Sequence, residues 1–408
     1  MTDQDTTDDG ANEVSTFGRR RRQFLGAMGA AGAAALAGCG GLLDGDSTPG
    51  TATAADYDAG DAAINMNSLS NYRGSGVFSE GRPAPGGTSM RDLPNLSGEL
   101  NIYLGAGEGG AYGQLFDIIA EIYPEFSYTT NALGSADAVN RIRNEYESDQ
   151  VSGDVYVAVD AGSLGQVADS GAALSLNSST TESVPDSYVG PNRQWVGFEG
   201  RARSIPYNTD EFDESDIPDS VADFPDTDAF AGNIGWAPTY SAFQSFVTAM
   251  ILQRGEDETR SWLEGIQNLD VTQYPDEFQL SGAVADGEQY VGFANHYYAL
   301  RVLNSRPDAP LDLAFTSGDA GALVNVSGAA ALANSGNSGL ADAFVRHLLS
   351  AEAQEFFATV TYGYPMIPDV SPVGGLPSID ELNSPDIDLT ELADKEDTLA
   401  LMRDVGVL

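Results

Sequence analysis

The residues of this chain with the clearest capacity for chemistry are two adjacent tyrosines, Tyr297 and Tyr298, which end the run Gly292-Phe-Ala-Asn-His-Tyr-Tyr298. A phenolate oxygen is a hard donor that suits a hard, highly charged cation such as Fe³⁺. A bound cation also converts a phenol, whose free pKa is about 10, to its anion near neutral pH. The alternative for such a pair is packing within a strand, where the two rings point to opposite faces.

The composition of the chain indicates the kind of solution in which the protein works. The chain has 408 residues, 61 of them acidic and 19 basic, for a formal charge of −42, and Lys395 is the only lysine. Scattered carboxylates together with 9% aromatic residues indicate a folded protein adapted to high salt, where self-repulsion is screened. An acidic surface that steers a ligand is the alternative. Nucleic-acid binding is disfavoured, because no basic patch occurs outside the N-terminus.

The N-terminus resembles an export address over residues 1–39. Arg21-Arg22 followed by Phe24-Leu25 is similar to a twin-arginine signal, and the run Leu36-Ala-Gly-Cys39 resembles a lipobox. The apolar run between them has about 15 residues, fewer than the ~20 that a membrane span needs. We therefore expect export by the twin-arginine route and a lipid on Cys39 that holds the protein at the outer face of the cytoplasmic membrane. Since Cys39 is the only cysteine, no intramolecular disulfide can form, and a free thiol is the alternative.

Two further regions follow the signal. Residues 40–95 are rich in Gly, Ser, Thr, Pro and Asp without apolar periodicity, which predicts a flexible tether. From residue 96 strand patterns alternate with helix patterns, as in Leu96–Leu104 followed by Tyr112–Tyr123, and this alternation predicts an α/β fold. In such sheets ligands bind near the carboxyl ends of the strands.

Other chemistries find little support in the sequence. The turn Gly105–Gly110 departs from the dinucleotide fingerprint and is either a ligand-binding loop or a plain strand-to-helix turn. A surface hydrolase is a weak alternative, because the chain has neither Gly-x-Ser-x-Gly nor His-Glu-x-x-His and only two histidines. A structural surface lipoprotein is disfavoured by the dense α/β pattern. We therefore expect a binding protein rather than an enzyme.

Five segments, taken in order along residues 96–370, resemble the ferric-iron-binding solute receptors of ABC importers, here in the form of a haloarchaeal-like twin-arginine lipoprotein. The segments are Asp154–Gly162, Trp195–Arg203, Ala237–Phe243, Tyr290–Tyr298, and Leu349–Phe357 with Tyr364-Pro365 after it. The resemblance implies a type II periplasmic-binding-protein fold, with two α/β lobes, a hinge and an interlobe cleft. The implied lobes are 96–195 with 322–372, and 196–321 with 373–408.

The resemblance also implies which residues bind the metal. Tyr297 and Tyr298 would bind Fe³⁺ as phenolates, so the pair should lie where a strand gives way to a turn or helix. Relatives take another ligand from the first strand-to-helix turn, where this chain offers Glu108 and no histidine; an ordinary turn residue is the alternative. Asp160 follows the third strand and is either a further ligand or the cap of the next helix. Tyr240 could also reach the metal.

The helix that opens at Pro238–Ala242 is the expected anion site, because free N–H groups and the positive end of the dipole meet there. In the family a small anion, carbonate or phosphate, completes the iron shell at this place. The candidates for binding it are Thr239, Ser241 and Ala242. Arg203, or less favourably Arg201, could support the anion through two hydrogen bonds, with a surface ion pair as the alternative.

The two histidines receive supporting roles in this reading. His296 lies next to the tyrosine pair and is expected behind it rather than on the metal, and His347 is expected to be structural. The predicted partners are the ABC permease and ATPase subunits and the membrane, with no nucleic acid, and the protein is expected to be a monomer. The alternative ligand for the same receptor fold is an organic solute or anion, namely thiamine, a polyamine, a phosphonate or a sugar.

Overall fold

The computed structural model describes residues 53–105 and 109–408. The export signal, Cys39, the start of the predicted tether and Glu108 therefore lie outside the described residues. From Gly50 onward the chain forms one compact unit.

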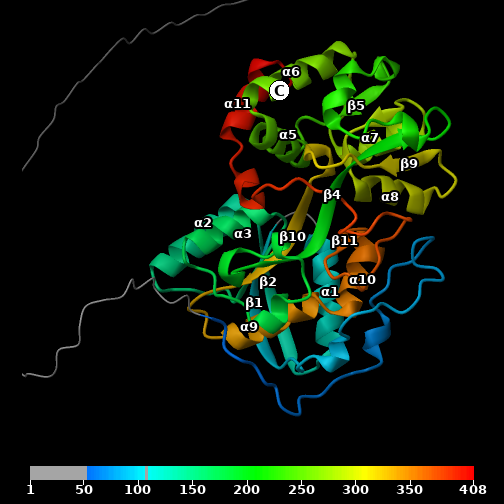
Figure 1. Cartoon of the computed structure of the whole chain (residues 1–408). Helices are drawn as coiled ribbons and strands as arrows, with labels where there is room; N and C mark the ends of the chain where they lie inside the picture. Colours follow the sequence, from blue (N-terminus) through cyan, green and yellow to red (C-terminus); the bar gives the residue numbers. More distant parts are fainter. Residues whose placement is uncertain (1–52, 106–108) are drawn as a thin grey trace, which may run out of the picture. The chain divides into compact units, whose positions relative to one another are not determined.

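A single long strand, β4 (Val196–Asn208), is the spine of this unit and runs between its two groups of elements (Figure 1). Its first half pairs antiparallel with β10 (Val324–Ala331) and β11 (Tyr364–Pro365), and its second half with β8, β9 and β7. All but one of its residues are buried, including the charged Glu199 and Arg203.

The first half of β4 belongs to a mixed sheet in which β1, β2 and β3 are parallel. β1 (Gly98–Gly105) pairs with β2 (Phe126–Leu133) on one side and with β3 (Val155–Ala158) on the other, and β10 pairs antiparallel with β3. Helix α1 (Gly109–Ile122) follows β1 directly and buries the apolar positions that its sequence spacing predicted, among them Leu115 and Ile119. The predicted α/β alternation is confirmed in this region.

The second half of β4 belongs to a smaller set of strands. β5 (Ile234–Trp236) pairs parallel with both β6 (Thr272–Gln273) and β7 (Val291–Gly292). Aromatic side chains fill the space between these strands and the helices that cover them, with Phe246 and Trp262 both in contact with Phe293.

The remaining elements complete the two groups. Their bounds are α2 (Ser135–Glu147), α3 (Ala161–Asp169), α4 (Ser178–Thr181), α5 (Ser241–Arg254), α6 (Glu256–Asn268), α7 (Glu277–Ala285), β8 (Ala294–Asn295), α8 (His296–Ser305), β9 (Leu311–Ala314), α9 (Ser338–Leu348), α10 (Ala351–Phe356), a π-helical turn (Phe357–Thr361) and α11 (Glu396–Asp404).

The C-terminal segment crosses between the two groups. A short 3₁₀ turn, Leu389–Ala393, packs on α3, and α11 then packs on α5 and α6. The first contact is close: a Cβ on Gly162 would lie 2.5 Å from the Cβ of Ala393, and one on Gly165 would lie 2.6 Å from Thr390. The two glycines therefore let the segment lie directly on α3.

The described part of the predicted tether packs on the body, so the prediction of a flexible tether over 40–95 is wrong from residue 53 onward. Thr53 forms a bridge with Ser175, and Met90 is fully buried. The sequence pattern did not show this packing because only short 3₁₀ turns interrupt an otherwise irregular backbone, so no period of 2 or 3.6 arises. We call residues 53–97 the belt.

Two arginines fix the belt to α10. Arg73 and Arg82 both lie 2.9 Å from the carboxylate of Glu355, whose side chain is only 2% exposed. The belt also reaches α8, because Gly76 approaches so closely that a Cβ there would lie 2.3 Å from the side-chain oxygen of Asn304. Removing one partner from such a buried ion pair is costly, so the belt is an integral part of the fold.

Candidate functional site

The tyrosine pair lies at the start of a helix, as its proposed chemistry required. β8 ends at Asn295, α8 begins at His296, and Tyr297 and Tyr298 occupy the first turn. Consecutive side chains on a helix diverge by about 100° rather than the 180° of a strand. The two ring centroids are consequently only 4.4 Å apart, and both side chains are buried. The prediction that a strand gives way to a helix at the pair is confirmed.

A third phenol reaches the same place from a different element. Tyr240 occupies the N-cap position of α5, and its hydroxyl forms a short hydrogen bond with the hydroxyl of Tyr298. The two ring centroids are 6.0 Å apart. The Tyr297 hydroxyl accepts a hydrogen bond of 3.2 Å from the side-chain amide of Asn295. Three phenol oxygens thus gather where sequence reasoning placed two and allowed a third.

The surroundings keep at least two of these phenols protonated while no cation is bound. Burial raises the pKa of Tyr298 far above its ordinary value, and the neighbouring Tyr297 and Tyr240 raise it further. Burial also raises the pKa of Tyr240, again with a contribution from Tyr297. Neighbouring phenolates repel one another, so three close phenols do not all ionise unless a cation lies between them. A trivalent cation between them reverses this balance, because it stabilises every phenolate at once.

A cation of the protein also faces the pair. The guanidinium of Arg301 lies 5.0 Å from the centroid of the Tyr297 ring and 5.4 Å from that of Tyr298. Sequence reasoning missed this residue, although its spacing of four from Tyr297 along a helix places the two side chains on one face. The positive charge of Arg301 favours electron-rich rings and would stabilise a phenolate at either tyrosine.

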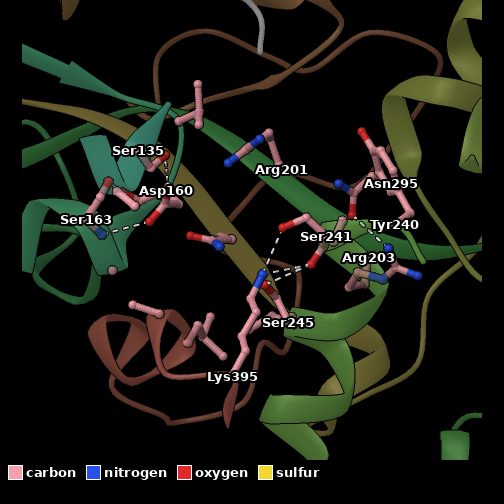
Figure 2. A pocket seen from close by; sticks show the side chains of 18 of the residues that line it. Ser135, Asp160, Ser163, Arg201, Arg203, Tyr240, Ser241, Ser245, Asn295 and Lys395 are labelled. Atoms are coloured by element: carbon pink, nitrogen blue, oxygen red, sulfur yellow. Dashed lines mark hydrogen bonds between the residues drawn. The ribbon is translucent and has the colours of Figure 1, made fainter. Parts of the chain in front are cut away.

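Two of the three phenols, Tyr240 and Tyr297, line a cavity of about 430 Å³ (Figure 2), and Tyr298 lies outside its lining. One wall is the tyrosine side, formed by the residues around Tyr240 and Tyr297 together with the start of α5. The other wall is the capped side, formed by Ser135, Asp160 and Ser163 at the starts of α2 and α3. The polar residues that line the cavity are Ser135, Asp160, Ser163, Gln166, Arg201, Arg203, Tyr240, Ser241, Ser245, Asn295, Tyr297, Asn325 and Lys395.

Asp160 caps a helix in this structure. Its carboxylate accepts a hydrogen bond of 2.7 Å from the backbone N–H of Ser163 and one of 3.0 Å from the hydroxyl of Ser135. The helix-capping alternative that the sequence left open is therefore what the geometry shows. Asp160 still lines the cavity, so its role as a metal ligand stays a prediction.

The N-terminus of α5 lacks such a cap. Tyr240 makes no side-chain capping bond, and Ser241 and Ala242 line the cavity directly behind it. Uncapped N–H groups at a helix start make a favourable position for an anion. Thr239, the third predicted anion ligand at this helix, is exposed and lies outside the cavity lining, because the turn before the helix points it away.

Arg203 lies at the cavity, although a buried carboxylate already binds one of its nitrogens. It is 3% exposed and donates through Nη1 to Glu277, which also accepts from the backbone N–H of Asn295 at 2.8 Å. Its Nη2 has no hydrogen-bond partner among the described residues. The surface ion pair that the sequence left open is thus excluded, since both partners are buried. Arg201, the less favoured candidate, also lines the cavity, and its Nε lacks a partner in the described part.

Lys395, the chain's only lysine, is the second residue that sequence reasoning missed. It arrives from the C-terminal segment just after the 3₁₀ turn on α3, and its Nζ donates to the backbone oxygen of Ser241 at 3.1 Å and to the Ser241 hydroxyl at 2.8 Å. The sequence showed that Lys395 is the only lysine, but it gave no indication that this residue lies at the cavity. Figure 2 shows its amine at the start of α5.

The two histidines are buried away from the cavity lining. The ring nitrogens of His296 face the backbone oxygens of Ala202 on β4 (3.2 Å) and Tyr362 (2.8 Å), so a neutral ring donates to one of them at a time. Nδ1 of His347 lies 2.7 Å from the backbone oxygen of Ala343, and its Nε2 lies 3.0 Å from the hydroxyl of Tyr123. Burial lowers the pKa of each imidazole to about 4, so both stay neutral at physiological pH.

Two properties of the described residues limit the chemistry further. They contain no group of three or more His, Cys, Asp or Glu side chains arranged to hold a metal ion. Phenols are thus the donors that converge in the described part of the chain. None of its helices combines the length and the apolar character that crossing a membrane requires.

Comparisons with known proteins agree with this geometry. Residues 152–386 match the family model described as bacterial extracellular solute-binding protein. The chain is 32% identical over 238 residues to the major ferric iron-binding protein of Neisseria meningitidis serogroup B, covering 58% of this chain and 70% of that protein. It is 31% identical over 302 residues to iron uptake protein A2 of Synechocystis, covering 70% of this chain and 85% of that protein.

A solved structure extends the similarity to the fold. Iron-bound HitA from Pseudomonas aeruginosa superposes with a TM-score of 0.64 at 29% identity, covering 76% of this chain and 99% of that one. Apo FutA2 from Synechocystis gives the same TM-score at 27% identity, with 76% and 100% of the two chains covered. The predicted two-lobed periplasmic-binding-protein fold is confirmed by these superpositions. The boundaries between the lobes remain a prediction.

Proposed function

Since this chain belongs to the ferric-iron-binding solute-binding proteins of ABC importers, we propose that it captures Fe³⁺ outside the cytoplasmic membrane and delivers it to an ABC permease with its ATPase. Proteins of this family bind and hand over a solute and are not enzymes. The fold supplies a cleft between two groups of elements that one long strand, β4, connects.

One observation carries the assignment of iron, namely the convergence of three phenols, two of which line the cavity. Tyr297 and Tyr298 lie side by side in the first turn of α8 with their rings tilted, and Tyr240 hydrogen-bonds to Tyr298 from the start of α5. Three phenolates together carry the charge that neutralises one Fe³⁺ ion, and their oxygens are hard donors. An organic solute such as thiamine, a polyamine, a phosphonate or a sugar requires no such cluster, and the relatives named for iron favour the metal over these alternatives.

The rest of the metal shell comes from two further places. Glu108, which lies outside the described residues, is the proposed carboxylate ligand, and Asp160 is the alternative to it, which requires its hydrogen bonds to Ser163 and Ser135 to break. A small anion, carbonate or phosphate, is proposed at the uncapped start of α5, bound by Ser241 and Ala242 with support from Arg203. The unpartnered Nη2 of Arg203 supplies the hydrogen bond that such an anion needs.

The location of the protein follows from the N-terminal sequence. We propose export by the twin-arginine route, lipid attachment at Cys39, and work as an anchored monomer in strong brine. The charge of −42 supports the last point. Cys39→Ala is expected to release the protein from the membrane fraction, and unchanged membrane association would contradict the anchor.

The experiment that tests the assignment is a ferric titration of the purified protein in molar KCl. Fe³⁺ should produce a visible phenolate-to-iron charge-transfer band with an endpoint of one metal per chain. The variant with Tyr297→Phe and Tyr298→Phe should lose the band and keep the melting temperature of the metal-free protein. Tyr290→Phe is the matched control, because Tyr290 packs on Phe212 outside the cavity lining, and it should keep the band. A wild-type protein that stays colourless would sink the iron assignment.

A further inference from the structure

The C-terminal segment ties the two walls of the cavity to each other, and we call residues 389–404 the strap. Its 3₁₀ turn, Leu389–Ala393, packs on α3 of the capped side, and its helix α11 packs on α5, whose start belongs to the tyrosine side. Figure 1 shows the strap in red, first beside α3 and then beside α5. Leu392, Ala393 and Lys395 line the cavity, so the strap passes along it. A segment attached to both walls limits how far they can separate.

On the capped side the strap is attached by close packing. A Cβ on Gly165 would lie 2.6 Å from the side chain of Thr390, so an alanine there would push the turn away from α3. Leu392 of the turn is buried, and the carboxylate of Asp388 accepts hydrogen bonds from the backbone N–H (2.9 Å) and the hydroxyl (2.7 Å) of Thr390. The turn is therefore fixed internally and moves with α3.

On the tyrosine side the strap is attached through α11. The hydroxyls of Thr398 on α11 and Thr248 on α5 form a hydrogen bond of 2.8 Å, and both side chains are buried. Met402 of the same helix is fully buried, and Asp404 at its end forms an ion pair with Arg260 of α6. Because apolar packing, a buried hydrogen bond and an ion pair all hold α11, this helix moves with α5 and α6.

Only Asp394 and Lys395 connect the two attachments, and we call this pair the join. Asp394 is already extended, with φ −82° and ψ 103°, whereas Lys395 has φ −110° and ψ 9°. One fully extended residue spans about 3.5 Å, so straightening Lys395 would lengthen the join by less than that. The two walls can therefore rotate about the join, but they cannot separate there unless an attachment breaks.

The side chain of Lys395 holds the join in one orientation. Its Nζ donates to the backbone oxygen of Ser241 at 3.1 Å and to the Ser241 hydroxyl at 2.8 Å (Figure 2). These two bonds tie the join to the first residue of α5. Water can replace them without exposing apolar surface, which is not so for the packing of the turn or of α11. They are thus the contacts that break first when the walls rotate.

We propose that the strap restrains the opening of the cleft, and that the bonds from Lys395 to Ser241 lock the join about which the walls rotate. Lys395 then acts as a positioning residue, because it sets how often the cleft opens and does not touch the metal. A receptor has to open to release its cargo, so a locked join slows the loss of iron. This last step rests on the proposed function, whereas the restraint can be measured without any ligand.

The first test measures the opening of the metal-free protein in molar KCl. Arg143→Cys on α2 and Glu264→Cys on α6 place spin labels at exposed positions of the two groups of elements, and Cys39→Ala leaves them as the only thiols. Double electron–electron resonance should give a distance distribution about twofold wider for Lys395→Met than for the parent. Lys395→Arg keeps a charged donor on a long side chain and should restore the narrow distribution.

Two further variants place the effect in the strap. Gly165→Ala loosens the turn from outside the cavity lining, so it should widen the distance distribution as Lys395→Met does. Arg403→Gln is the matched control, because it removes a positive charge from an exposed position of α11, and it should leave the distribution unchanged. If the distribution is equally narrow for the parent, Lys395→Met and Gly165→Ala, the strap does not restrain the cleft and the proposal is wrong.

The second test measures the release of Fe³⁺ to a competing chelator by the decay of the charge-transfer band. Lys395→Met and Gly165→Ala should each release iron about tenfold faster than the wild type, with the position of the band unchanged because no phenol is altered. Faster release in Lys395→Met alone, without a wider distance distribution, would show that the lysine contacts a bound ligand and would overturn the strap. A wild-type protein that never forms the band refutes the proposed function, and the metal-free distances still decide whether the strap restrains the cleft.

A third measurement uses the wild-type chain, so it does not depend on a variant that folds. Because Lys395 is the only lysine, acetylation modifies one side chain in the whole sequence, apart from the terminal amine. Acetylation removes the charge and two of the three N–H donors, so the bonds to Ser241 weaken. The acetylated protein should release iron at the rate of Lys395→Met, and release at the rate of the unmodified protein would contradict a lock at this residue.

Discussion

Two helix starts face the same cavity, and they differ in one respect. α3 begins with Asp160, whose carboxylate accepts the N–H of Ser163 and closes the end of the helix. α5 begins with Tyr240, which makes no capping bond with its side chain and turns its hydroxyl toward Tyr298 instead. The N-terminus of α3 therefore has a carboxylate of the chain bound to its N–H groups, and the N-terminus of α5 has none.

The difference indicates how work is divided across the cleft. A capped helix start is satisfied and rigid, so the capped side contributes shape and neutral hydroxyls. An uncapped start keeps N–H groups available, and the tyrosine side adds the three phenols beside them. We therefore expect the metal and the anion to contact the tyrosine side first.

The largest expected effect tests the tyrosine side. Tyr240→Phe removes one of three phenol donors and should weaken Fe³⁺ binding at least a hundredfold, which corresponds to about 3 kcal/mol. Competition against a chelator of known ferric affinity measures the change. Tyr274→Phe, outside the cavity lining, is the control and should bind as the wild type does. A loss below threefold for Tyr240→Phe would mean that this phenol is a neighbour of the site and no ligand.

The next effect concerns the buried carboxylate that supports the tyrosine side. Glu277→Gln removes the charge that Arg203 pairs with and weakens the bond to the Asn295 N–H, so we expect the free energy of unfolding to fall by about 2 kcal/mol. Denaturant titration of the metal-free protein measures it. The matched change on the surface is Glu258→Gln, whose carboxylate lies 3.9 Å from Arg254 and is 70% exposed, and it should cost almost nothing.

A third prediction uses the protons of the phenols. The pKa of Tyr298 and that of Tyr240 are raised in the empty site, so both phenols hold their protons at neutral pH and must lose them when iron binds. Binding therefore weakens as pH falls, by about tenfold per pH unit for each proton released. Proton release in weakly buffered solution should be larger for the wild type than for the Tyr297→Phe, Tyr298→Phe protein. Equal release would place the ionisation elsewhere.

The smallest effect tests the capped side. Asp160→Asn keeps an N-cap and removes the charge, so it should change neither stability nor iron affinity by more than about 0.5 kcal/mol, whereas Asp160→Ala should lower stability by about 1 kcal/mol. A tenfold loss of iron affinity in Asp160→Asn would show that the carboxylate leaves the helix and binds the metal. The contrast between the two sides of the cleft would then be wrong.

The sequence predicted those parts of the site in which the role of a residue depends on the strand or helix that contains it. Tyr297 and Tyr298 had to start a helix for their oxygens to converge, and they do. The alternative that Asp160 caps a helix could be read from its place after a strand and before a helical pattern. Thr239 was assigned to the anion because it precedes the helix, but whether a turn residue faces the cavity depends on the path of the turn.

Other parts depend on contacts that no local pattern records. Lys395 reaches Ser241 from 154 positions further along the chain, and Arg82 reaches Glu355 across 273 positions. Each contact is set by how the C-terminal segment or the belt crosses the body. A segment without a helix or strand period still packs when its charged groups find buried partners, and sequence periodicity does not report this.

The belt has a consequence for where the receptor works. Because Thr53 already pairs with Ser175, at most residues 40–52 separate the body from Cys39. If Cys39 carries the lipid, thirteen residues span no more than about 45 Å even when fully extended. A connection of that length would keep the body close to the bilayer and raise its effective concentration at the permease. In that case the receptor would bind iron and deliver it to the permease without moving far from the membrane surface.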